Sequence, residues 1–352
     1  MKDKGLKVGL VGCGWAARLA HIPALAKNRS AQLVAVCDRD EELARQTARE
    51  HGVRSYYTDV SQMLRGEDLR VVDICTPPVT HHTISLEAMA AGCHVLVEKP
   101  LSHSVAEADE MVDAARQSGV KLCVVHNQLF LPVVLKARSM VAQGAIGEVT
   151  GIEIVDSLPR GLEALAERGH WYHRLPGGAF GEMLPHPIYL ASAFVDDLAV
   201  VAVQAKSISG RDWMPADELR VILEGRQGLV TITESLNWPK DTMTVHIFGT
   251  RRCLCAAIHG GVLTRYGAGA ESRAWRAIDN VSQGCQLLAG TISTTMSVTW
   301  GRYRNGHRTL IDRFIEAVAT DAAPPVSGEE GREVVRLWQD ITSRIDGSTA
   351  RG

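Results

Sequence analysis

Three sets of residues in this sequence have types and spacings that could do chemistry. The first is the turn GCGWAA, in which Gly12, Gly14 and Ala17 fill a G-x-G-x-x-A pattern directly after the apolar run KVGLVG. The first glycine permits a tight turn, the second lets a pyrophosphate approach the backbone, and the small third residue lets a helix pack against a strand. The helix that opens here would hold phosphates at its N-terminus.

An acidic residue follows the next apolar run. Asp38 closes QLVAVCD, where a carboxylate can accept hydrogen bonds from both hydroxyls of an adenosine ribose and repels the 2′-phosphate of NADP. The neighbouring Arg39 could stack on adenine or bind that phosphate, so NADP stays open as an alternative. The turn and the acid together predict a dinucleotide site that prefers NAD and includes Trp15 and Ala16.

The second set is VEKP, which places Glu98 and Lys99 at the end of an apolar run and stops them with Pro100. Ligands bind open α/β sheets at this end of the strands. A proline favours extended backbone in the residue before it, and strand alternation then sends the two charged side chains to opposite sides. Lys99 could exchange a proton with a substrate hydroxyl as hydride leaves the same carbon. The alternative is a solvated lysine at a strand end.

These residues must be positioned by the elements that the apolar pattern predicts. Up to residue 126, short apolar runs alternate with segments of helical periodicity, which indicates a parallel sheet covered on both faces. Residues 1–126 are therefore predicted to form a doubly wound dinucleotide-binding domain. The predicted strands span 7–12, 32–38, 71–77, 94–100 and 121–127, and the predicted helices span 40–51, 81–92 and 103–118.

The remaining residues, 127–352, show a different pattern. A predicted helix at 131–143 is followed by strands that succeed one another through short turns, which is typical of a largely antiparallel sheet. We expect an α/β domain that binds substrate and forms the oligomer, with helix 330–345 packing back on the first domain. The predicted strands span 147–157, 198–209, 217–224, 228–236, 242–249 and 252–258, and the predicted terminal helices span 307–319 and 330–345.

The composition argues against several classes of partner. With 45% hydrophobic and 22% charged residues and a formal net charge of −2, the chain resembles an ordinary globular protein without a general attraction to nucleic acid or anionic membranes. No apolar run suits a spanning helix and no signal-peptide layout precedes the first strand, so we expect a cytoplasmic location. Cys253 and Cys255 lack a second ligand pair, and no metal is predicted.

Several motifs resemble the glucose–fructose oxidoreductase/inositol dehydrogenase family, also called Gfo/Idh/MocA. They are VGLVGCGWAARLAHIPAL, LVAVCDRD, VDICTPPVTHHTISLEAMAAGCHVLVEKPL, IGEV, GGAFGEMLPH and PPVSGEEGREVV. The resemblance implies an N-terminal Rossmann domain, a C-terminal α/β domain with an open, mostly antiparallel sheet, and an active site in the cleft between them. It also implies a homodimer or homotetramer formed through the sheet.

The resemblance extends the predicted cofactor site. It places the turn of Thr76 and Pro77 against the nicotinamide riboside, matches His81 to the family's histidine and Asn127 to an asparagine near the nicotinamide. For His81, a structural role at a helix start is an equal alternative. The family frequently has an arginine two positions after the asparagine, but this chain has Leu129, which puts a charged substrate contact there in doubt.

The third chemical set comes from the same resemblance. In GGAFGEMLPHPIYL, His186 matches the family's catalytic histidine and Glu182 replaces its aspartate, while Leu184 and Pro185 replace the usual glycine and its neighbour. Glu182 and His186 would share a helix face, but the prolines predict a kink or a helix that begins near Pro187. A core histidine is the alternative for His186.

An aromatic and basic cluster precedes this block. Trp171, Tyr172 and His173, followed by Arg174, could line a polar substrate pocket, or could form a surface loop or subunit contact.

The combined prediction is an NAD(P)-dependent oxidoreductase acting on a sugar, aminosugar, cyclitol or related polyol, with Lys99 and His186 handling the proton. Three alternatives share this fold: a redox-neutral NAD-dependent glycosidase, a reductase of imines or ketones in a biosynthetic pathway, and a non-catalytic sensor.

Overall fold

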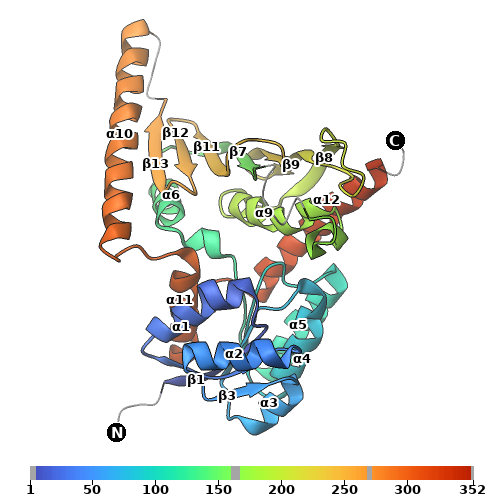
Figure 1. Ribbon diagram of the computed structural model, residues 1–352. Helices are drawn as coiled ribbons and strands as arrows, with labels where there is room; N and C mark the ends of the chain where they lie inside the picture. The colour runs from blue at the N-terminus through green and yellow to red at the C-terminus, as the bar shows by residue number, and fades with distance from the viewer. Residues whose placement is uncertain (1–4, 160–166, 268–271, 350–352) are drawn as a thin grey trace. The chain divides into compact units, whose positions relative to one another are not determined.

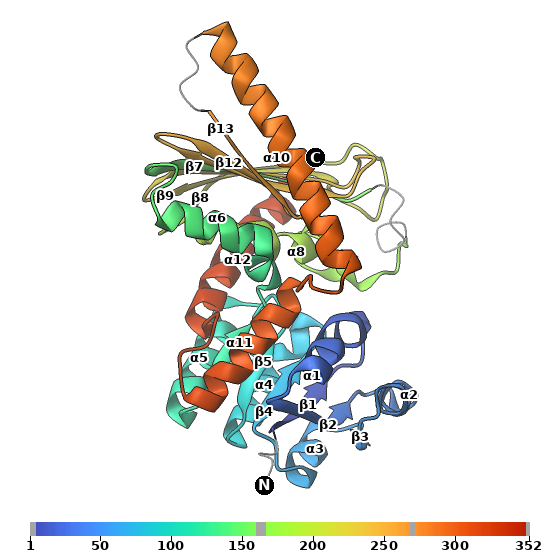
Figure 2. The same ribbon diagram turned by 90° about the vertical axis from the view of Figure 1, so that its left-hand side faces the viewer.

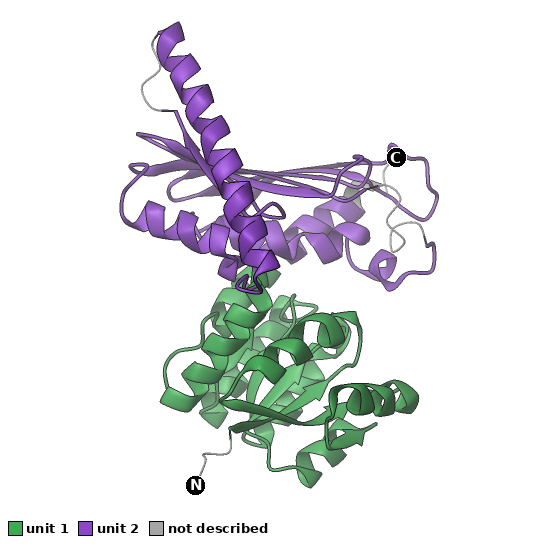
Figure 3. Ribbon diagram, turned by 60° about the vertical axis from the view of Figure 1, so that its left-hand side comes forward, with its two compact units in different colours: residues 1–127, 305–336 green, residues 128–304, 337–352 purple. Residues whose placement is uncertain are grey.

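The chain forms two compact units in the computed structural model, which describes residues 5–159, 167–267 and 272–349. The first unit comprises residues 1–127 and 305–336, and the second comprises residues 128–304 and 337–352 (Figure 3). The first unit is thus discontinuous in sequence. The sequence predicted a boundary after residue 126 and a helix at 330–345 that packs back on the first domain, but it did not predict that the helix at 307–319 also belongs to this unit.

The first unit contains a parallel sheet of six strands in the order β3-β2-β1-β4-β5-β6. This order is that of a doubly wound dinucleotide-binding fold, and the predicted fold class is confirmed. The short strand β3 was not predicted, because only three residues carry it. The strands are β1 Leu6–Val11, β2 Ala31–Cys37, β3 Ser55–Tyr57, β4 Val71–Ile74, β5 His94–Val97 and β6 Leu122–Val124.

Local capping sets the ends of the predicted helices in this unit. The Asp40 carboxylate accepts the Leu43 N–H at the start of α2, and Ser104 accepts the Glu107 N–H at the start of α5. Figures 1 and 2 show α1 and α11 side by side. The helices are α1 Ile22–Lys27, α2 Glu41–His51, α3 Val60–Gly66, α4 His81–Ala90, α5 Val105–Ser118 and α11 Gly306–Thr320.

The last helix, α12 (Gly328–Thr349), is divided between the units after residue 336. Its first turns pack on the first unit: a Cβ at Gly331 would overlap the Val124 side chain, and Arg332 pairs with Asp109 at 2.8 Å. The start of the predicted 330–345 helix therefore contacts the parallel sheet through a glycine that permits the close approach.

The second unit contains a sheet of seven strands in the order β13-β12-β11-β7-β10-β9-β8. All neighbouring pairs are antiparallel except β7 and β10, which confirms the mostly antiparallel sheet. Strand β13 was not predicted. The strands are β7 Val149–Ser157, β8 Ala199–Lys206, β9 Glu218–Gly225, β10 Gly228–Ser235, β11 Thr242–Gly249, β12 Cys253–Ala257 and β13 Val262–Tyr266.

Helices cover one face of this sheet. Figures 1 and 2 show α6 (Pro132–Ala142), α8 (Ala179–Met183) and α9 (Pro185–Ser192) on the same side. Outward-facing apolar side chains, including Val201, Ile222 and Leu229, are exposed on strands β8 to β10. The sheet therefore has one buried face and one open face.

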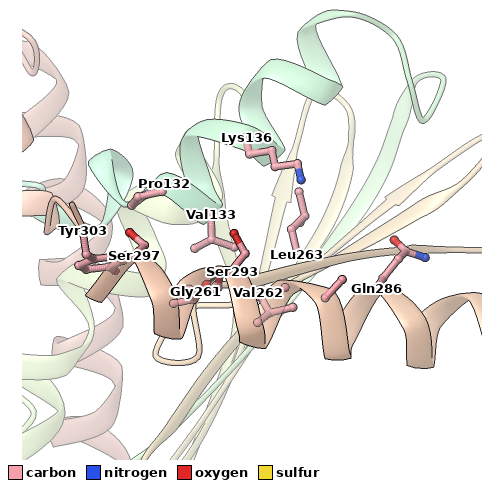
Figure 4. Close-up of a pocket in the computed structure, with 13 residues that line it drawn as sticks. Pro132, Val133, Lys136, Gly261, Val262, Leu263, Gln286, Ser293, Ser297 and Tyr303 are labelled. Carbon is pink, nitrogen blue, oxygen red and sulfur yellow. Dashed lines mark hydrogen bonds between the residues drawn. The ribbon is translucent and has the colours of Figure 1, made fainter. Parts of the chain in front are cut away.

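The long helix α10 (Arg273–Thr299) lies along the edge strand β13 and was not predicted. None of its residues is buried, although apolar residues such as Ile278, Val281 and Leu288 recur along it at helical spacing. Side chains of α6 and α10 line a hollow of about 470 Å³, which includes Lys136, Ser297 and Tyr303 (Figure 4). This hollow contains none of the residues that the sequence predicts for the site. Among the described helices, none is both long and apolar enough to cross a membrane.

Candidate active site

The glycine turn has the shape that a dinucleotide phosphate requires. Gly12 adopts a φ of +91°, and a Cβ there would lie 2.7 Å from the Cys75 carbonyl carbon, so only glycine fits. A Cβ on Gly14, by contrast, would meet no atom within 4 Å. The fold itself does not require a glycine at Gly14. The open space matches the close approach of a ligand to the backbone, as the motif predicts.

The residues after the turn form a π-helical segment, Ala17–His21, which continues into α1. Ala17 is fully buried and lets this segment pack against the sheet, whereas Trp15 is 73% exposed. Ala16 precedes the segment as its N-cap. The predicted turn residues therefore divide into buried packing positions and an exposed aromatic ring.

Asp38 is attached to the glycine turn by hydrogen bonds. Its Oδ2 accepts the Cys13 N–H at 2.8 Å, and its Oδ1 accepts the Asp40 N–H at 3.0 Å. The carboxylate therefore lies where β2 ends, directly beside the turn. Arg39, next to it, is exposed. This arrangement fits a ribose held by Asp38 while the turn holds the phosphates.

His81 joins two of the predicted loops. Its Nε2 lies 2.8 Å from the Thr76 carbonyl oxygen and its Nδ1 lies 2.9 Å from that of Pro100. Burial lowers the pKa of this histidine, and a neutral ring carries one N–H, so only one of the two contacts is a hydrogen bond. The ring is fully buried, and it ties the turn of Thr76 and Pro77 to the end of the VEKP segment.

Glu98 and Lys99 follow directly after β5. The Lys99 N–H donates to Glu98 Oε2 at 3.0 Å, and the peptide bond between Lys99 and Pro100 is cis. Glu98 Oε1 lies 2.9 Å from His21 Nε2, so the glutamate side chain turns into the interior. Lys99 is half-buried. Glu98 thus holds the backbone of Lys99 through this hydrogen bond.

A buried histidine lies between two carboxylates. His21 Nδ1 is 2.9 Å from Asp73 Oδ2, and its Nε2 bonds Glu98. Burial would lower the pKa of His21, but the Asp73 charge outweighs it and holds that pKa well above the usual range. Burial would likewise raise the pKa of Glu98, but hydrogen bonds from His21 and His307 hold it well below. His21 is therefore an imidazolium between two carboxylates.

His307 extends this group to the end of β6. Its Nε2 lies 3.6 Å from Glu98 Oε1, and the Asn127 side-chain amide donates to its Nδ1 at 3.3 Å. A Cβ on Gly306 would overlap the Asn127 carbonyl oxygen, so this glycine lets α11 approach β6. Asn127 was predicted to contact the cofactor, and the structure shows what orients its amide.

Sequence reasoning missed His21, Asp73 and His307. A signal was present for two of them: Asp73 is an acid inside an otherwise apolar strand, and His21 follows the glycine turn within a short apolar helix. Charged residues in such positions need a partner. His307 lies far along the chain, and only the return of residues 305–336 to the first unit brings it here.

Two groups of these residues have spacings that could hold a metal ion: His21, Glu98 and His307, and His21, Asp73 and Cys75. Both groups depend on His21, whose two ring nitrogens already face carboxylates at 2.9 Å. A metal ligand needs a free lone pair, which an imidazolium does not have. The geometry therefore favours an ion-pair network at this place.

In the second unit, the helical path changes at the prolines. Leu184 ends α8 and precedes α9, which begins at Pro185, so Glu182 and His186 lie on successive short helices. The sequence predicted a kink or a start near Pro187, and the break lies at Pro185, where a proline fits the first helical position. Both Glu182 and His186 are half-buried.

Tyr189 is a partner of His186 that sequence reasoning missed. Its hydroxyl lies 2.6 Å from His186 Nδ1, three residues along α9, and it accepts the Gln128 N–H at 3.3 Å. The tyrosine hydroxyl therefore orients the His186 ring through its Nδ1.

The aromatic cluster packs next to α8. The ring of Tyr172 contacts the rings of His170 and Trp171, with centroids 4.3 and 4.5 Å away. Burial raises the pKa of Tyr172 to about 12, and the negative charge of Glu182 adds to this effect. Tyr172 and Glu182 are therefore close enough to interact electrostatically, while Trp171 remains partly exposed.

Comparison with known protein families is consistent with both units. Residues 6–126 match the family model described as an oxidoreductase family with an NAD-binding Rossmann fold, and residues 134–254 match the GFO/IDH/MocA C-terminal domain. The chain belongs to the GFO/IDH/MocA family. Its first unit thus carries the NAD-binding Rossmann fold of this family, and Asp38 lies beside the turn that contains Gly12 and Gly14.

Two of the similar proteins match shorter stretches. The chain is 33% identical to Oxidoreductase P35 of Formosa agariphila over 52% of its own length and 58% of that protein. It is 33% identical to D-glucoside 3-dehydrogenase of Escherichia coli over 42% of each chain. The chain therefore spans about half the length of these curated relatives.

A solved structure shares the complete fold. The WlbA dehydrogenase from Bordetella pertussis, determined in complex with NADH and UDP-GlcNAcA, superimposes with a TM-score of 0.80 at 21% identity and covers 99% of this chain and 97% of its own. At this identity the likeness concerns the fold.

Proposed function

We propose that this GFO/IDH/MocA protein is an NAD-dependent oxidoreductase. It transfers hydride between the nicotinamide and a carbinol or carbonyl carbon of a sugar, aminosugar, cyclitol or related polyol. The observation that carries the proposal is Lys99 at the end of β5, held through its backbone N–H by Glu98, in a sheet whose glycine turn leaves space for a dinucleotide. NAD supplies the hydride acceptor when it is bound.

The proposed proton chemistry rests on two residues. Lys99 accepts the proton of the substrate hydroxyl in the oxidative direction, and His186 acts as a second acid or base, with its ring oriented by Tyr189. Glu182 and the cluster of Trp171, Tyr172 and His173 bind the substrate. The aromatic rings offer apolar faces, and the acid accepts hydrogen bonds from hydroxyl groups.

The names of similar proteins support the class of substrate. A D-glucoside 3-dehydrogenase acts on a sugar, and the WlbA structure holds a nucleotide sugar together with NADH. In this chain, Glu182 replaces the aspartate of the family pattern, and Pro185 replaces the residue next to its glycine. The substrate therefore differs in size or polarity from those of the better-known sugar members. Asp38 favours NAD over NADP.

The test is a screen of sugars, aminosugars, cyclitols and imines for a change in NADH absorbance, repeated with Lys99→Ala. We expect turnover with a polyhydroxylated substrate, and we expect the variant to lose it by about 10²–10⁴-fold while binding NADH normally. His82→Ala, on the surface of α4, is the matched control. Full turnover in Lys99→Ala would refute the role of the lysine. Cofactor that stays bound without net NADH formation would favour the redox-neutral glycosidase.

We also propose that the protein is a homo-oligomer and that a second copy covers the open face of the second unit's sheet. The exposed fractions of Val201, Ile222 and Leu229 reach 52%, 38% and 55%. These three side chains lie on neighbouring strands, and exposed apolar side chains grouped in this way support an interaction surface.

A further inference from the structure

The charged residues buried around His21 have no role in the proposed proton transfer. A continuous series of contacts runs from Asp73 on β4 through His21 and Glu98 to His307 and Asn127. We refer to these five residues as the relay. All five belong to the first unit, and the relay connects the carboxyl ends of β4, β5 and β6 beneath Lys99.

The charges in the relay do not cancel. Two carboxylates, Asp73 and Glu98, face one imidazolium, His21. Asn127 is an amide, and its side-chain N–H donates to His307 Nδ1, which is the geometry of a neutral imidazole. The relay therefore carries one excess negative charge. Two other buried histidines next to it, His81 and His126, are kept neutral, because burial lowers the pKa of the former and lowers that of the latter to about 3.

The sheet order indicates which part of the cofactor this charge faces. Asp38 lies at the end of β2, and the glycine turn lies at the end of β1. If Asp38 holds the adenosine ribose and the glycine turn holds the pyrophosphate, the nicotinamide half of the dinucleotide must extend toward β4 and β5. The reason is that the strand order reverses between β1 and β4. Glu98 follows β5 directly, and 12% of its side chain is exposed.

Nicotinamide changes its charge in the reaction. The oxidised ring is a cation and the reduced ring is neutral, so a fixed negative charge nearby stabilises the oxidised form more. We propose that the relay carries one net negative charge that makes the protein favour NAD⁺ over NADH, with Glu98 as the residue that sets this preference. This inference rests on the proposed function and adds the direction in which the bound cofactor is biased.

The relay is suited to this role because it cannot easily relax. Asp73 and His21 have no exposed side-chain surface, so solvent does not screen their contact. His21 bonds both carboxylates at once, which keeps Glu98 ionised despite its burial. Glu98 in turn accepts the Lys99 backbone N–H, which holds the carboxylate close to the Lys99 backbone. A glutamine at this position preserves the shape and removes the charge.

The experiment compares the dissociation constants of NAD⁺ and NADH, measured by calorimetry and by fluorescence, in the wild type and in Glu98→Gln. We expect the ratio of the NAD⁺ constant to the NADH constant to rise on the order of tenfold in the variant, with the NADH constant changed by less than about twofold. Glu110→Gln is the matched control, because Glu110 also pairs with a histidine, His82, at 2.8 Å, but on the surface. An unchanged ratio, or an equal loss of both affinities, would overturn the proposal.

A second measurement needs neither substrate nor cofactor. In protein labelled with ¹⁵N-histidine, we expect NMR to show one imidazole that stays doubly protonated at alkaline pH and whose signals disappear in His21→Gln. A His21 ring with one bare nitrogen at neutral pH would refute the charge count. If the wild type binds neither nucleotide, the proposed function fails, while the NMR result still decides the charge state on which the relay depends.

Discussion

At the scale of single residues, Asp38 combines two roles that the sequence could not separate. Its carboxylate is positioned to accept from a ribose, and it also accepts the N–H groups of Cys13 and Asp40. A change at Asp38 can therefore alter cofactor choice through lost charge or through a loosened glycine turn. The two effects are separable, because an asparagine oxygen can still accept from Cys13.

We predict that Asp38→Ser shifts the preference from NAD toward NADP by about 10- to 100-fold, since the repulsion of the 2′-phosphate is removed. Asp38→Asn should gain NADP affinity as well and lose less NAD affinity, because it retains the turn. The measurement is a titration of both cofactors with each variant. An unchanged affinity ratio in both variants would contradict the role of the Asp38 charge.

A second prediction at the scale of residues concerns His186 and Tyr189. Tyr189→Phe removes the hydroxyl at 2.6 Å from Nδ1, so the His186 ring loses the hydrogen bond that orients it. We expect the turnover number to fall about 10- to 100-fold with little change in KM, and the unfolding free energy to fall by about 1 kcal/mol. Ser192→Ala, at the end of the same helix, is the control.

A pH–rate profile distinguishes a catalytic effect from loss of structure in Tyr189→Phe. If His186 titrates in the reaction, the limb of the profile that reports it should move in the variant. A profile of unchanged shape with uniformly lower rates would show that the tyrosine only stabilises α9.

At the scale of elements, the parallel pair β7 and β10 places two carboxyl groups opposite each other. Asp156 and Glu234 are aligned in the register, and both are buried. Burial, together with the charge of Asp241, raises the pKa of Asp156 to about 7; burial, together with Asp156, raises the pKa of Glu234 well above its usual range. The strands therefore pair most favourably when these groups are protonated.

The sign of the pH effect follows from these raised pKa values. In the unfolded chain both acids ionise near pH 4, whereas in the folded chain Asp156 holds its proton up to about pH 7. The folded state binds more protons in this window, so stability falls as pH rises from about 4 to 7 and stays lower above it. We predict that Glu234→Gln raises Tm at pH 8 by about 2–4 °C and has little effect at pH 5.

Thermal unfolding at the two pH values measures this effect. Glu316→Gln, on the exposed side of α11 in the other unit, is the control and should leave Tm unchanged at both. Equal shifts of Tm at pH 5 and pH 8 in Glu234→Gln would show that the gain comes from packing and that the two acids do not repel each other.

The elements also show where local patterns predict well. Strands β1, β2, β4 and β5 were predicted because buried parallel strands are near-continuous apolar runs, and α2 and α5 because their caps and periodicity agree. Helix α10 and strand β13 were missed. They pack on each other at the edge of the sheet. Strand β13 is only five residues long, whereas α10 carries apolar residues at helical spacing, which is a signal that the sequence prediction did not use.

At the scale of the whole molecule, the open face of the seven-stranded sheet yields a prediction on assembly. We expect Leu229→Glu combined with Ile222→Lys to lower the molar mass measured by light scattering, because charges would be buried against a second copy. Tyr56→Lys on β3 removes an exposed aromatic ring outside this face and should leave the mass unchanged. A double variant with the wild-type mass would refute this interface.

The sequence by itself determined the parts of the protein that depend on neighbours in the chain. A glycine turn after an apolar run, an acid after the next run and a lysine before a proline each follow from local backbone geometry. They predicted the Rossmann fold, the NAD site and the position of Lys99 at a strand end. The family resemblance supplied His186, Glu182 and Asn127.

Only the tertiary structure decided which residues support these groups. Helix α11 carries His307 to Asn127, and Gly306 allows the close approach. The fold also places His21 between Asp73 and Glu98. Contacts of this kind join residues that are far apart in the chain, and no periodicity encodes them. These contacts form because a buried charged group has no water to bind. Its partner must therefore come from a segment that the fold brings close to it.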